Sequence, residues 1–267
     1  MLTIANLHGA EQSGSAPTIT PMPSQRFDTI DTLRGVAVVW MTLFHFCFDL
    51  NQFGYWQQNF YADPFWTTQR TLIVSLFLFG AGLGQAVAVA QGQTPLRFCK
   101  RWAQVAACAL LVTAGSWWMY PKSFIYFGVL HGIALMLIVV RLTAGWGSWL
   151  WLAGAIAIAM KFVAAYAHGT GANIGFLDEM GLNWLGLIGR KPVTEDYVPL
   201  LPWLGVMWWG MAAGQWLLAS KPGCLQQAIP LFAAPLAWLG RWSLSWYMLH
   251  QPVLIGLFMA LAMLKTP

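Results

Sequence analysis

Apolar residues in this chain gather in long continuous runs separated by short polar segments. Seven of these runs are close to the 17–25 residues that a helix needs to cross a hydrocarbon core about 30 Å thick. They are too long and too uniform for the alternating strands of an outer-membrane barrel. The pattern therefore predicts an all-α, polytopic integral membrane bundle with about seven transmembrane helices, at residues 31–52, 67–90, 99–119, 123–141, 147–167, 199–219 and 241–264.

Two further segments depart from this pattern. Segment 228–239 is apolar but short, and it is broken by Pro230 and Pro235, so we expect a re-entrant or interfacial half-helix there. Residues 1–25 are rich in Ser, Thr, Pro, Gly and Gln and contain no apolar core of a signal peptide. We expect a flexible cytoplasmic tail over 1–25 and a single transmembrane domain over 26–267.

The composition supports a membrane protein and excludes several other classes. The 267 residues are 58% hydrophobic and 9% charged, with a mean hydropathy of +0.58, whereas soluble domains carry about 25% charged residues. A soluble enzyme and a disordered regulator are excluded. The net charge of +5 is scattered rather than clustered, which argues against a nucleic-acid partner. The four cysteines show no CxxC motif and no disulfide framework.

Basic residues in short loops predict the orientation, because cytoplasmic loops are enriched in Lys and Arg. The opposite side would hold the loops at 53–66, 120–122 and 168–198. We therefore expect a bacterial inner-membrane protein with a cytoplasmic N-terminus, and an outer C-terminus unless segment 228–239 crosses as well. The basic residues on the predicted cytoplasmic side are Arg26, Arg34, Arg97, Lys100, Arg101, Arg141 and Lys221.

The first predicted helix carries four ionisable residues in an otherwise apolar run: Asp31, Arg34, His45 and Asp49. Arg34 and His45 are eleven residues apart, which places both on one face, separated by about 16 Å along the axis. Ionisable groups inside a bilayer cost at least about 2.5–3.5 kcal/mol and usually face an interior cavity. The stripe predicts a hydrated path through the bundle.

Two more histidines lie in predicted spans, His131 and His250, at a depth similar to that of His45. The three imidazoles can converge on one site, and histidine can accept or donate a proton near pH 7. A structural role is the alternative: close helix contact at Gly128 for His131, and a network with Tyr247 for His250. The spacing gives no support for a metal site.

Charged residues at both ends of the bundle also allow two interpretations. Arg97, Lys100 and Arg101 either signal topology or bind the phosphates of a nucleotide-like cofactor. Glu195 and Asp196 either cap a helix or recognise a cationic or polyhydroxyl substrate at the outer mouth.

Several motifs resemble one family of membrane enzymes. The run IDTLRGVAVVWMTLFHF resembles the first span of the heparan-alpha-glucosaminide N-acetyltransferase catalytic-domain family, in its short bacterial branch. The spacing of an Arg, ten residues and then a His in this run is also similar to that in the type 3 acyltransferases. Matching motifs follow in order over roughly 26–256: SLFLFGAGL, RFCKR, FGVLHGIAL, DYVPLLPWLGV and LGRWSLSWYMLHQPV.

The resemblance implies transfer of an acetyl group from cytoplasmic acetyl-CoA to a sugar, amino sugar or glycan on the outer side. It implies that His45 is the general base or a transient acyl carrier, and that Arg34 and Asp31 help to hold the donor. Arg97, Lys100 and Arg101 would then meet the phosphates of the donor, with no metal needed. The acceptor side would be formed by Asp49, His131, Asp196, Tyr247 and His250.

Two other functions stay open at this point. A transporter could use the His, Asp and Arg stripe as a proton relay, although the odd number of spans and the lack of a repeat argue against it. A partner subunit or a lipid-binding scaffold without turnover is the third hypothesis. The expected partners are the lipid bilayer, acetyl-CoA and the acceptor, and association with a second copy of the chain is left open.

Overall fold

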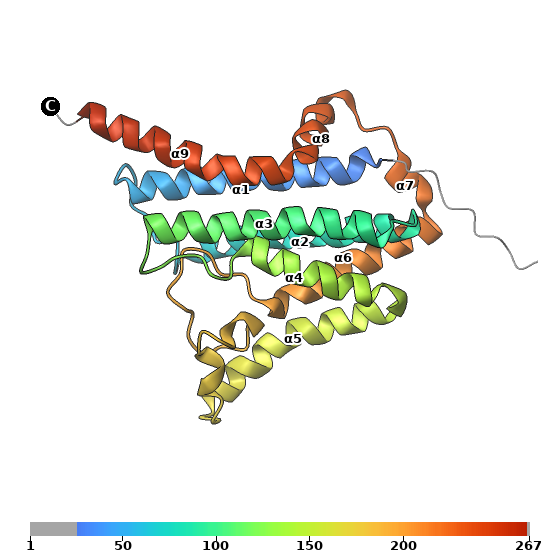
Figure 1. Cartoon of the computed structure of the whole chain (residues 1–267), viewed down its shortest axis with the longest axis horizontal. Coiled ribbons are helices and arrows are strands. Elements are labelled where there is room, and N and C mark those ends of the chain that lie inside the picture. The colour runs from blue at the N-terminus through green and yellow to red at the C-terminus, as the bar shows by residue number, and fades with distance from the viewer. Residues whose placement is uncertain (1–25, 266–267) are drawn as a thin grey trace, which may run out of the picture.

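A computed structural model describes residues 26–265, and over this range the fold is all-helical (Figure 1). The prediction of a flexible tail over 1–25 lies outside the described residues. The long helices are α1 Asp28–Gln52, α2 Pro64–Ala90, α3 Pro95–Met119, α4 Val129–Leu142, α5 Trp149–Gly169, α6 Leu200–Ser220 and α9 Ser243–Lys265. The short ones are η1 Ala144–Trp146, η2 Gly175–Asp178, η3 Asn183–Leu185, α7 Pro222–Gln226, η4 Leu231–Ala233 and α8 Ala234–Arg241.

Helix starts follow the local sequence. Asp63 accepts a hydrogen bond from the Phe65 backbone N–H at 2.8 Å, and Pro64 occupies the first turn of α2. Thr94 caps α3, which also begins with a proline. A side-chain oxygen at the cap satisfies one of the free N–H groups, and proline has no N–H to lose there. The predicted starts of α2 and α3, which followed the apolar runs, left out this capped first turn and were three and four residues too late.

Four of the described helices are long and apolar enough to cross a membrane: α1, α2, α5 and α9 up to Leu264. The apolar helix α4 has only 14 residues. The all-helical membrane fold is therefore confirmed, whereas seven crossings remain a prediction. Figure 1 shows that the predicted grouping of loops is correct. The α1–α2, α3–α4 and α5–α6 connections lie at one end, called the outer end here, and the start of α1 and the α2–α3 and α4–α5 connections lie at the opposite, inner end. Which end faces the cytoplasm also remains a prediction.

The start of α4 was predicted wrongly. The sequence predicted a helix from 123, but residues 123–128 are not helical, and their backbone pairs with the segment before α6. The Glu195 N–H donates to the Ser123 carbonyl at 2.9 Å, and Val198 N–H donates to the Phe127 carbonyl at 3.2 Å. These bonds to a distant segment satisfy the backbone groups that a local helix would otherwise satisfy. The apolar pattern alone could not reveal this pairing.

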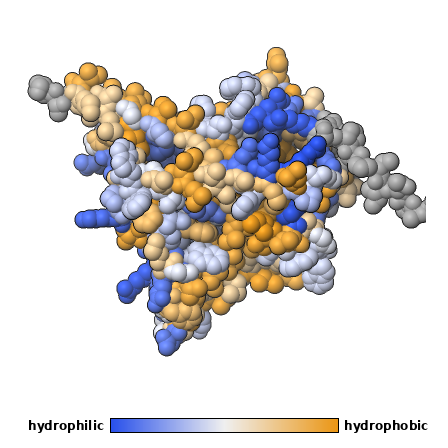
Figure 2. Space-filling view, viewed as in Figure 1, coloured by the Kyte–Doolittle hydropathy of each residue, from blue (hydrophilic) through white to orange (hydrophobic). Residues whose placement is uncertain are grey.

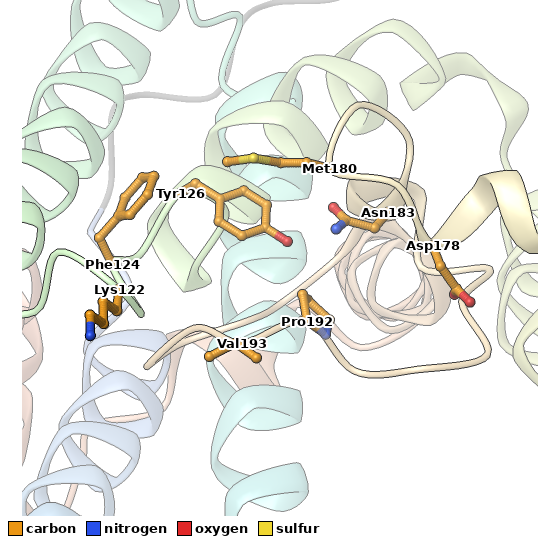
Figure 3. Close-up of a pocket in the computed structure, with 8 residues that line it drawn as sticks. All are labelled: Lys122, Phe124, Tyr126, Asp178, Met180, Asn183, Pro192 and Val193. Atoms are coloured by element: carbon orange, nitrogen blue, oxygen red, sulfur yellow. The ribbon is translucent and has the colours of Figure 1, made fainter.

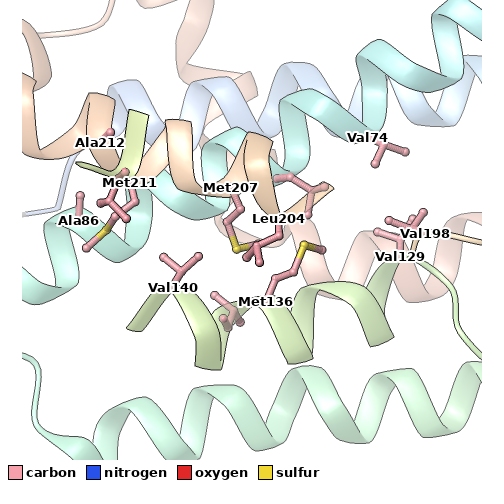
Figure 4. Packing of buried hydrophobic residues seen from close by; sticks show 13 residues of the cluster. Val74, Ala86, Val129, Met136, Val140, Val198, Leu204, Met207, Met211 and Ala212 are labelled. Carbon is pink, nitrogen blue, oxygen red and sulfur yellow. The ribbon is translucent and has the colours of Figure 1, made fainter. Parts of the chain in front are cut away.

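The hydrophobic core lies between α2, α4 and α6. Leu78, Met136, Val140 and Met207 are essentially inaccessible to solvent and meet in this layer (Figure 4). A glycine lets α2 and α6 come close, because a Cβ atom at Gly82 would collide with the α6 backbone. Small residues at such contacts are how helices pack in membranes without a hydrophobic driving force between them.

Helix α8 occupies the second half of the segment expected to be a half-helix. It packs across the first half of α1, where Gly35 touches the Leu236 backbone and Gly240 touches the Asp31 backbone. Helix α9 then begins near the middle of α1 and runs in the same direction toward the outer end (Figure 1). The connection through α8 therefore decides which residues of α9 face α1.

The surface of the molecule matches a membrane-embedded body. In Figure 2, hydrophilic residues gather toward the two ends of the bundle and hydrophobic residues cover much of the face between them. Large apolar side chains on this surface include Leu110, Trp118, Phe162 and Val253, each more than 60% exposed. Such a surface is stable only in contact with lipid or with another protein.

Candidate functional site: a histidine pair between α1 and α9

The outer half of α1 and the first half of α9 bring two of the predicted histidines together. The ring centroids of His45 and His250 are 5.1 Å apart, with the planes inclined at 60°. One turn farther along, Gln251 donates to Asp49 at 3.0 Å. Asp49 is 2% exposed and His250 is 8% exposed. Four polar side chains therefore form a small cluster inside the apolar part of the bundle.

The hydrogen bond of His250 defines which of its nitrogens is free. Its Nδ1 lies 2.7 Å from the backbone carbonyl oxygen of Tyr247. A carbonyl oxygen can only accept, so Nδ1 carries the proton and Nε2 of the neutral ring presents a lone pair. That Nε2 is buried and has no hydrogen-bond partner among the described residues. His250 is therefore oriented as a proton acceptor.

Other buried polar atoms of the cluster also lack partners within residues 26–265. They are Nδ1 of His45 and the side-chain oxygen of Gln251. Buried polar atoms are nearly always hydrogen-bonded, and each exception needs an explanation. Together with Nε2 of His250, three such atoms lie on neighbouring side chains of this cluster, where a polar ligand would find hydrogen-bonding groups.

Aromatic rings enclose the outer side of the pair. Phe44 contacts the His45 ring edge-on, with centroids 5.8 Å apart, and also contacts Phe60 and Trp66. Phe60 and Trp66 stack at 4.1 Å and are 3% and 7% exposed. These rings come from α1, α2 and the loop between them. They limit the access of water to the histidines from the outer end.

His131 has a hydrogen-bond network of its own. The Gly128 N–H donates to its Nδ1 at 3.3 Å, so its Nε2 carries the proton and donates to Thr113 at 3.0 Å. The Thr113 hydroxyl in turn donates to the Ile125 carbonyl. Among the described residues, no hydrogen bond or ring contact joins His131 to the histidine pair. The structure thus brings two of the three imidazoles into contact, and a role for His131 on the acceptor side stays a prediction.

Asp196 lies at the start of α4 rather than open to the outer mouth. Its Oδ2 accepts from the Val129 N–H at 2.7 Å, and the lack of a side chain at Gly128 makes room for it. Burial raises the pKa of Asp196, and the Val129 bond and the charge of Lys191 oppose this rise. Asp196 is also within electrostatic range of the Tyr247 hydroxyl. Asp196 therefore acts as a cap for the first turn of α4.

A cluster of charges forms at the inner end of α1. Asp31 is 3% exposed, and its carboxylate lies 2.7 Å from Arg26, 3.4 Å from Arg34 and 3.8 Å from Arg241. Arg241 also pairs with Asp28 at 2.8 Å. Three arginines against two aspartates leave a surplus of positive charge. Asp31 holds the guanidinium groups in place, and its own carboxylate has little surface left for a ligand.

One of the three predicted basic residues of α3, Arg101, lies near this cluster. The Arg34 guanidinium extends over Gly84 of α2, where a Cβ atom would collide with it, and is within electrostatic range of Arg101. Arg97, Lys100 and Arg101 are all exposed. Arg101 therefore extends the positive region of Arg34, whereas Arg97 and Lys100 lie along the same exposed turn of α3.

Comparison with known proteins identifies the family. The family model for the catalytic region of heparan-alpha-glucosaminide N-acetyltransferase matches residues 26–252. The chain belongs to this family. The match begins at Arg26 and ends just after His250, so it includes both the charged cluster and the histidine pair. Searches of curated proteins and of solved structures found no match.

Membership of this family makes the chain a membrane acetyltransferase-like protein, and two residues of its site were not singled out from the sequence. Arg241 and Gln251 both lie in the motif LGRWSLSWYMLHQPV, in which only Tyr247 and His250 were predicted to belong to the site. Arg241 is paired with a residue 213 positions away. A search of that motif for polar residues next to His250 would have found Gln251, but nothing local indicates the partner of Arg241.

Among residues 26–265, no group of three or more His, Cys, Asp or Glu side chains is arranged to hold a metal ion. The arginines at the inner end are instead suited to anions, because guanidinium groups form bidentate bonds to phosphate. The residues present are thus compatible with a phosphate-bearing acyl donor.

Proposed function

We propose that this protein transfers an acetyl group from acetyl-CoA to an amine or hydroxyl group of a sugar or amino sugar, with His45 and His250 as the reacting pair. Membership of the acetyltransferase family supports the reaction class. The observation that carries the proposal is the buried, unpartnered Nε2 of His250, whose proton is held on Nδ1 by the Tyr247 carbonyl. Its neighbour His45 has a free buried nitrogen as well.

The two imidazoles match the requirements of acyl transfer. The acceptor nitrogen or oxygen attacks the thioester carbonyl carbon, and its proton moves to a histidine nitrogen. The new C–N or C–O bond forms, the C–S bond breaks, and the histidine returns the proton to the departing thiolate. A positioned base of this kind contributes about 10²–10⁴ in rate. Transient transfer of the acetyl group to His45 is a variant of the same route.

The surroundings of the pair support transfer rather than hydrolysis. Phe44, Phe60 and Trp66 cover the pair on the outer side, and exclusion of water protects a thioester from hydrolysis. Asp49 and Gln251 lie beside the pair and offer hydrogen bonds to a polar acceptor. This arrangement agrees with the expected acceptor side for Asp49 and His250.

The inner end supports entry of the donor from that side. Arg26, Arg34 and Arg241 are held around two aspartates with a net positive charge, and Arg101 lies close enough to Arg34 to add to it. Phosphate groups are favourable partners for such clusters. We therefore place the nucleotide part of the donor at Arg34 and Arg101, with Arg97 and Lys100 at the margin.

The test is an acetyl-transfer assay on the purified full chain in nanodiscs, with labelled acetyl-CoA and a panel of amino sugars. His45→Ala is expected to abolish transfer while the protein remains folded. The matched control is His168→Ala, because this histidine lies at the end of α5 and bonds to the Leu187 carbonyl. Wild-type turnover in His45→Ala would refute a catalytic role for His45. Uptake of a substrate into vesicles without any acyl donor would favour the transporter instead.

A further inference from the structure

The outer end of the molecule contains a second concave region, formed by loops. A pocket of about 320 Å³ lies between the α3–α4 connection, the η2–η3 region and the segment before α6 (Figure 3). This volume is near the lower limit of small-molecule sites, about 300–1,000 Å³. Residues from all three segments line it, among them Lys122, Phe124, Tyr126, Asp178, Met180 and Asn183.

The walls of the pocket are fixed by hydrogen bonds outside it. The Ser123 hydroxyl donates to the Glu195 carboxylate at 2.5 Å, and the Glu195 N–H returns a bond to the Ser123 carbonyl. The Tyr197 hydroxyl donates to the Asn183 carbonyl at 2.6 Å. Asp178 accepts two backbone N–H groups from the loop that follows η3. The concavity is therefore preformed, which lowers the entropy cost of binding.

Two polar atoms of the pocket lining lie close to each other and make no hydrogen bond of normal geometry with a described residue. Asn183 is 3% exposed, and its Oδ1 makes no hydrogen bond with any described residue. The Tyr126 hydroxyl is likewise buried and without a hydrogen bond in this part of the chain. Figure 3 shows this hydroxyl pointing toward the Asn183 amide. Burial raises the pKa of Tyr126, and the Asn183 side chain opposes this rise, so the hydroxyl keeps its proton and can donate to a ligand.

Aromatic and apolar surfaces complete the lining. The rings of Phe124 and Tyr126 are 6.2 Å apart and inclined at 65°, so they form two sides of a corner. Met180 and Pro192 add further apolar surface. A ligand that fits this lining needs apolar C–H faces for the rings and several hydroxyl or amide groups for Asn183 and Tyr126. One sugar ring has both properties.

We propose that this pocket binds one sugar ring of the acceptor, as an anchoring subsite separate from the histidine pair. The identification of that sugar with the acceptor rests on the proposed function. The pocket lies at the same end of the molecule as the histidine pair. The Tyr197 hydroxyl bonds to the Asn183 carbonyl in its wall, and the neighbouring Asp196 lies within electrostatic range of Tyr247, whose carbonyl accepts from His250. Binding energy gained at a remote ring serves to orient the reacting group.

The test measures sugar binding without any acyl donor. Saturation-transfer NMR and titration on the full chain in detergent would use glucosamine, N-acetylglucosamine and their disaccharides as probes. Tyr126→Phe is expected to weaken binding about 3- to 10-fold, because it removes one hydrogen bond. Its melting temperature should stay close to that of the wild type, because the hydroxyl makes no hydrogen bond of normal geometry with the described residues. Asn183→Ala should weaken binding further, and Tyr166→Phe, on the exposed outer end of α5, is the matched control.

The outcomes separate this proposal from the proposed function. Failure of all probes to bind the wild type, or equal affinity in wild type and Tyr126→Phe, would overturn the sugar site. His45→Ala should bind the probes as the wild type does, although it does not transfer acetyl groups. A third outcome is that the wild type binds the sugars but transfers no acetyl group, and that the pocket variants lose this binding. This result would support the sugar site and count against the proposed reaction.

Discussion

The most informative perturbation removes the free nitrogen of His250 while preserving its structural bond. In His250→Asn, the side-chain amide can still donate to the Tyr247 carbonyl that now accepts from Nδ1 at 2.7 Å. The lone pair of Nε2, which is buried and unpartnered among the described residues, is lost. Stability should change little, because no existing hydrogen bond is broken. The variant therefore tests proton transfer rather than folding.

The expected loss follows from the contribution of a general base. Removing one lowers kcat by about 10²–10⁴, which corresponds to about 2.7–5.4 kcal/mol of transition-state stabilisation. His45→Ala should cause a loss of the same size. Because the two rings are in contact at 5.1 Å, they should act as a unit. The kcat of the double variant is then expected to be no lower than that of the less active single variant.

The assay is release of free CoA and formation of acetylated sugar by the purified chain, with kcat and KM determined separately. The single variants should lower kcat and leave the KM for acetyl-CoA nearly unchanged. Multiplicative losses in the double variant would show that the histidines act independently. Near wild-type turnover in His250→Asn, beside an inactive His45→Ala, would refute the reasoning from the tautomer of His250.

Three further predictions concern the donor, the outer cap and the packing of α8. Arg101→Ala should raise the KM for acetyl-CoA about 2- to 10-fold. The control Lys161→Ala, at an exposed position of α5, should leave this KM unchanged. A KM in Arg101→Ala equal to that of the wild type would leave Arg101 as a topology signal. Burial raises the pKa of Asp196, so its contribution to stability is complete below about pH 3.9 and is lost as the pH rises through the raised, folded-state pKa. Asp196→Asn should flatten the pH profile of the melting temperature, and an unchanged profile would contradict this. Gly240→Ala should cost about 1–3 kcal/mol in thermal unfolding, because the methyl group would meet the Asp31 backbone; Gly256→Ala, which meets nothing within 4 Å, is the control.

The helical elements were predictable because their signals are local. Runs of apolar residues about 20 long define α1, α2, α5 and α9, and caps such as Asp63 and Thr94 define where helices begin. The non-helical segment 123–128 was missed for the opposite reason. Its backbone groups bond to residues some 70 positions later, and no pattern within a window of the sequence contains that information.

The same distinction applies to the candidate site. The polar residues on α1 stood out because each is unusual in an apolar helix, and this reasoning found His45 and Asp49. It did not predict that Asp31 would be enclosed by arginines, since Arg241 is distant in the chain. Asn183 and Tyr126 gave no signal either, because a loop asparagine and a loop tyrosine are ordinary until burial leaves their polar atoms without partners.

Helix α8 explains why both ends of the site depend on one short segment. It packs across the inner half of α1, so that Arg241 at its C-terminal end reaches Asp28 and Asp31. Two residues later α9 begins, already halfway along α1, and its next two turns place His250 beside His45. A shift of one residue in this connection would rotate His250 by about 100° away from its partner. The arginine cluster and the histidine pair are therefore set in register by the same contact, that of Gly240 with the α1 backbone.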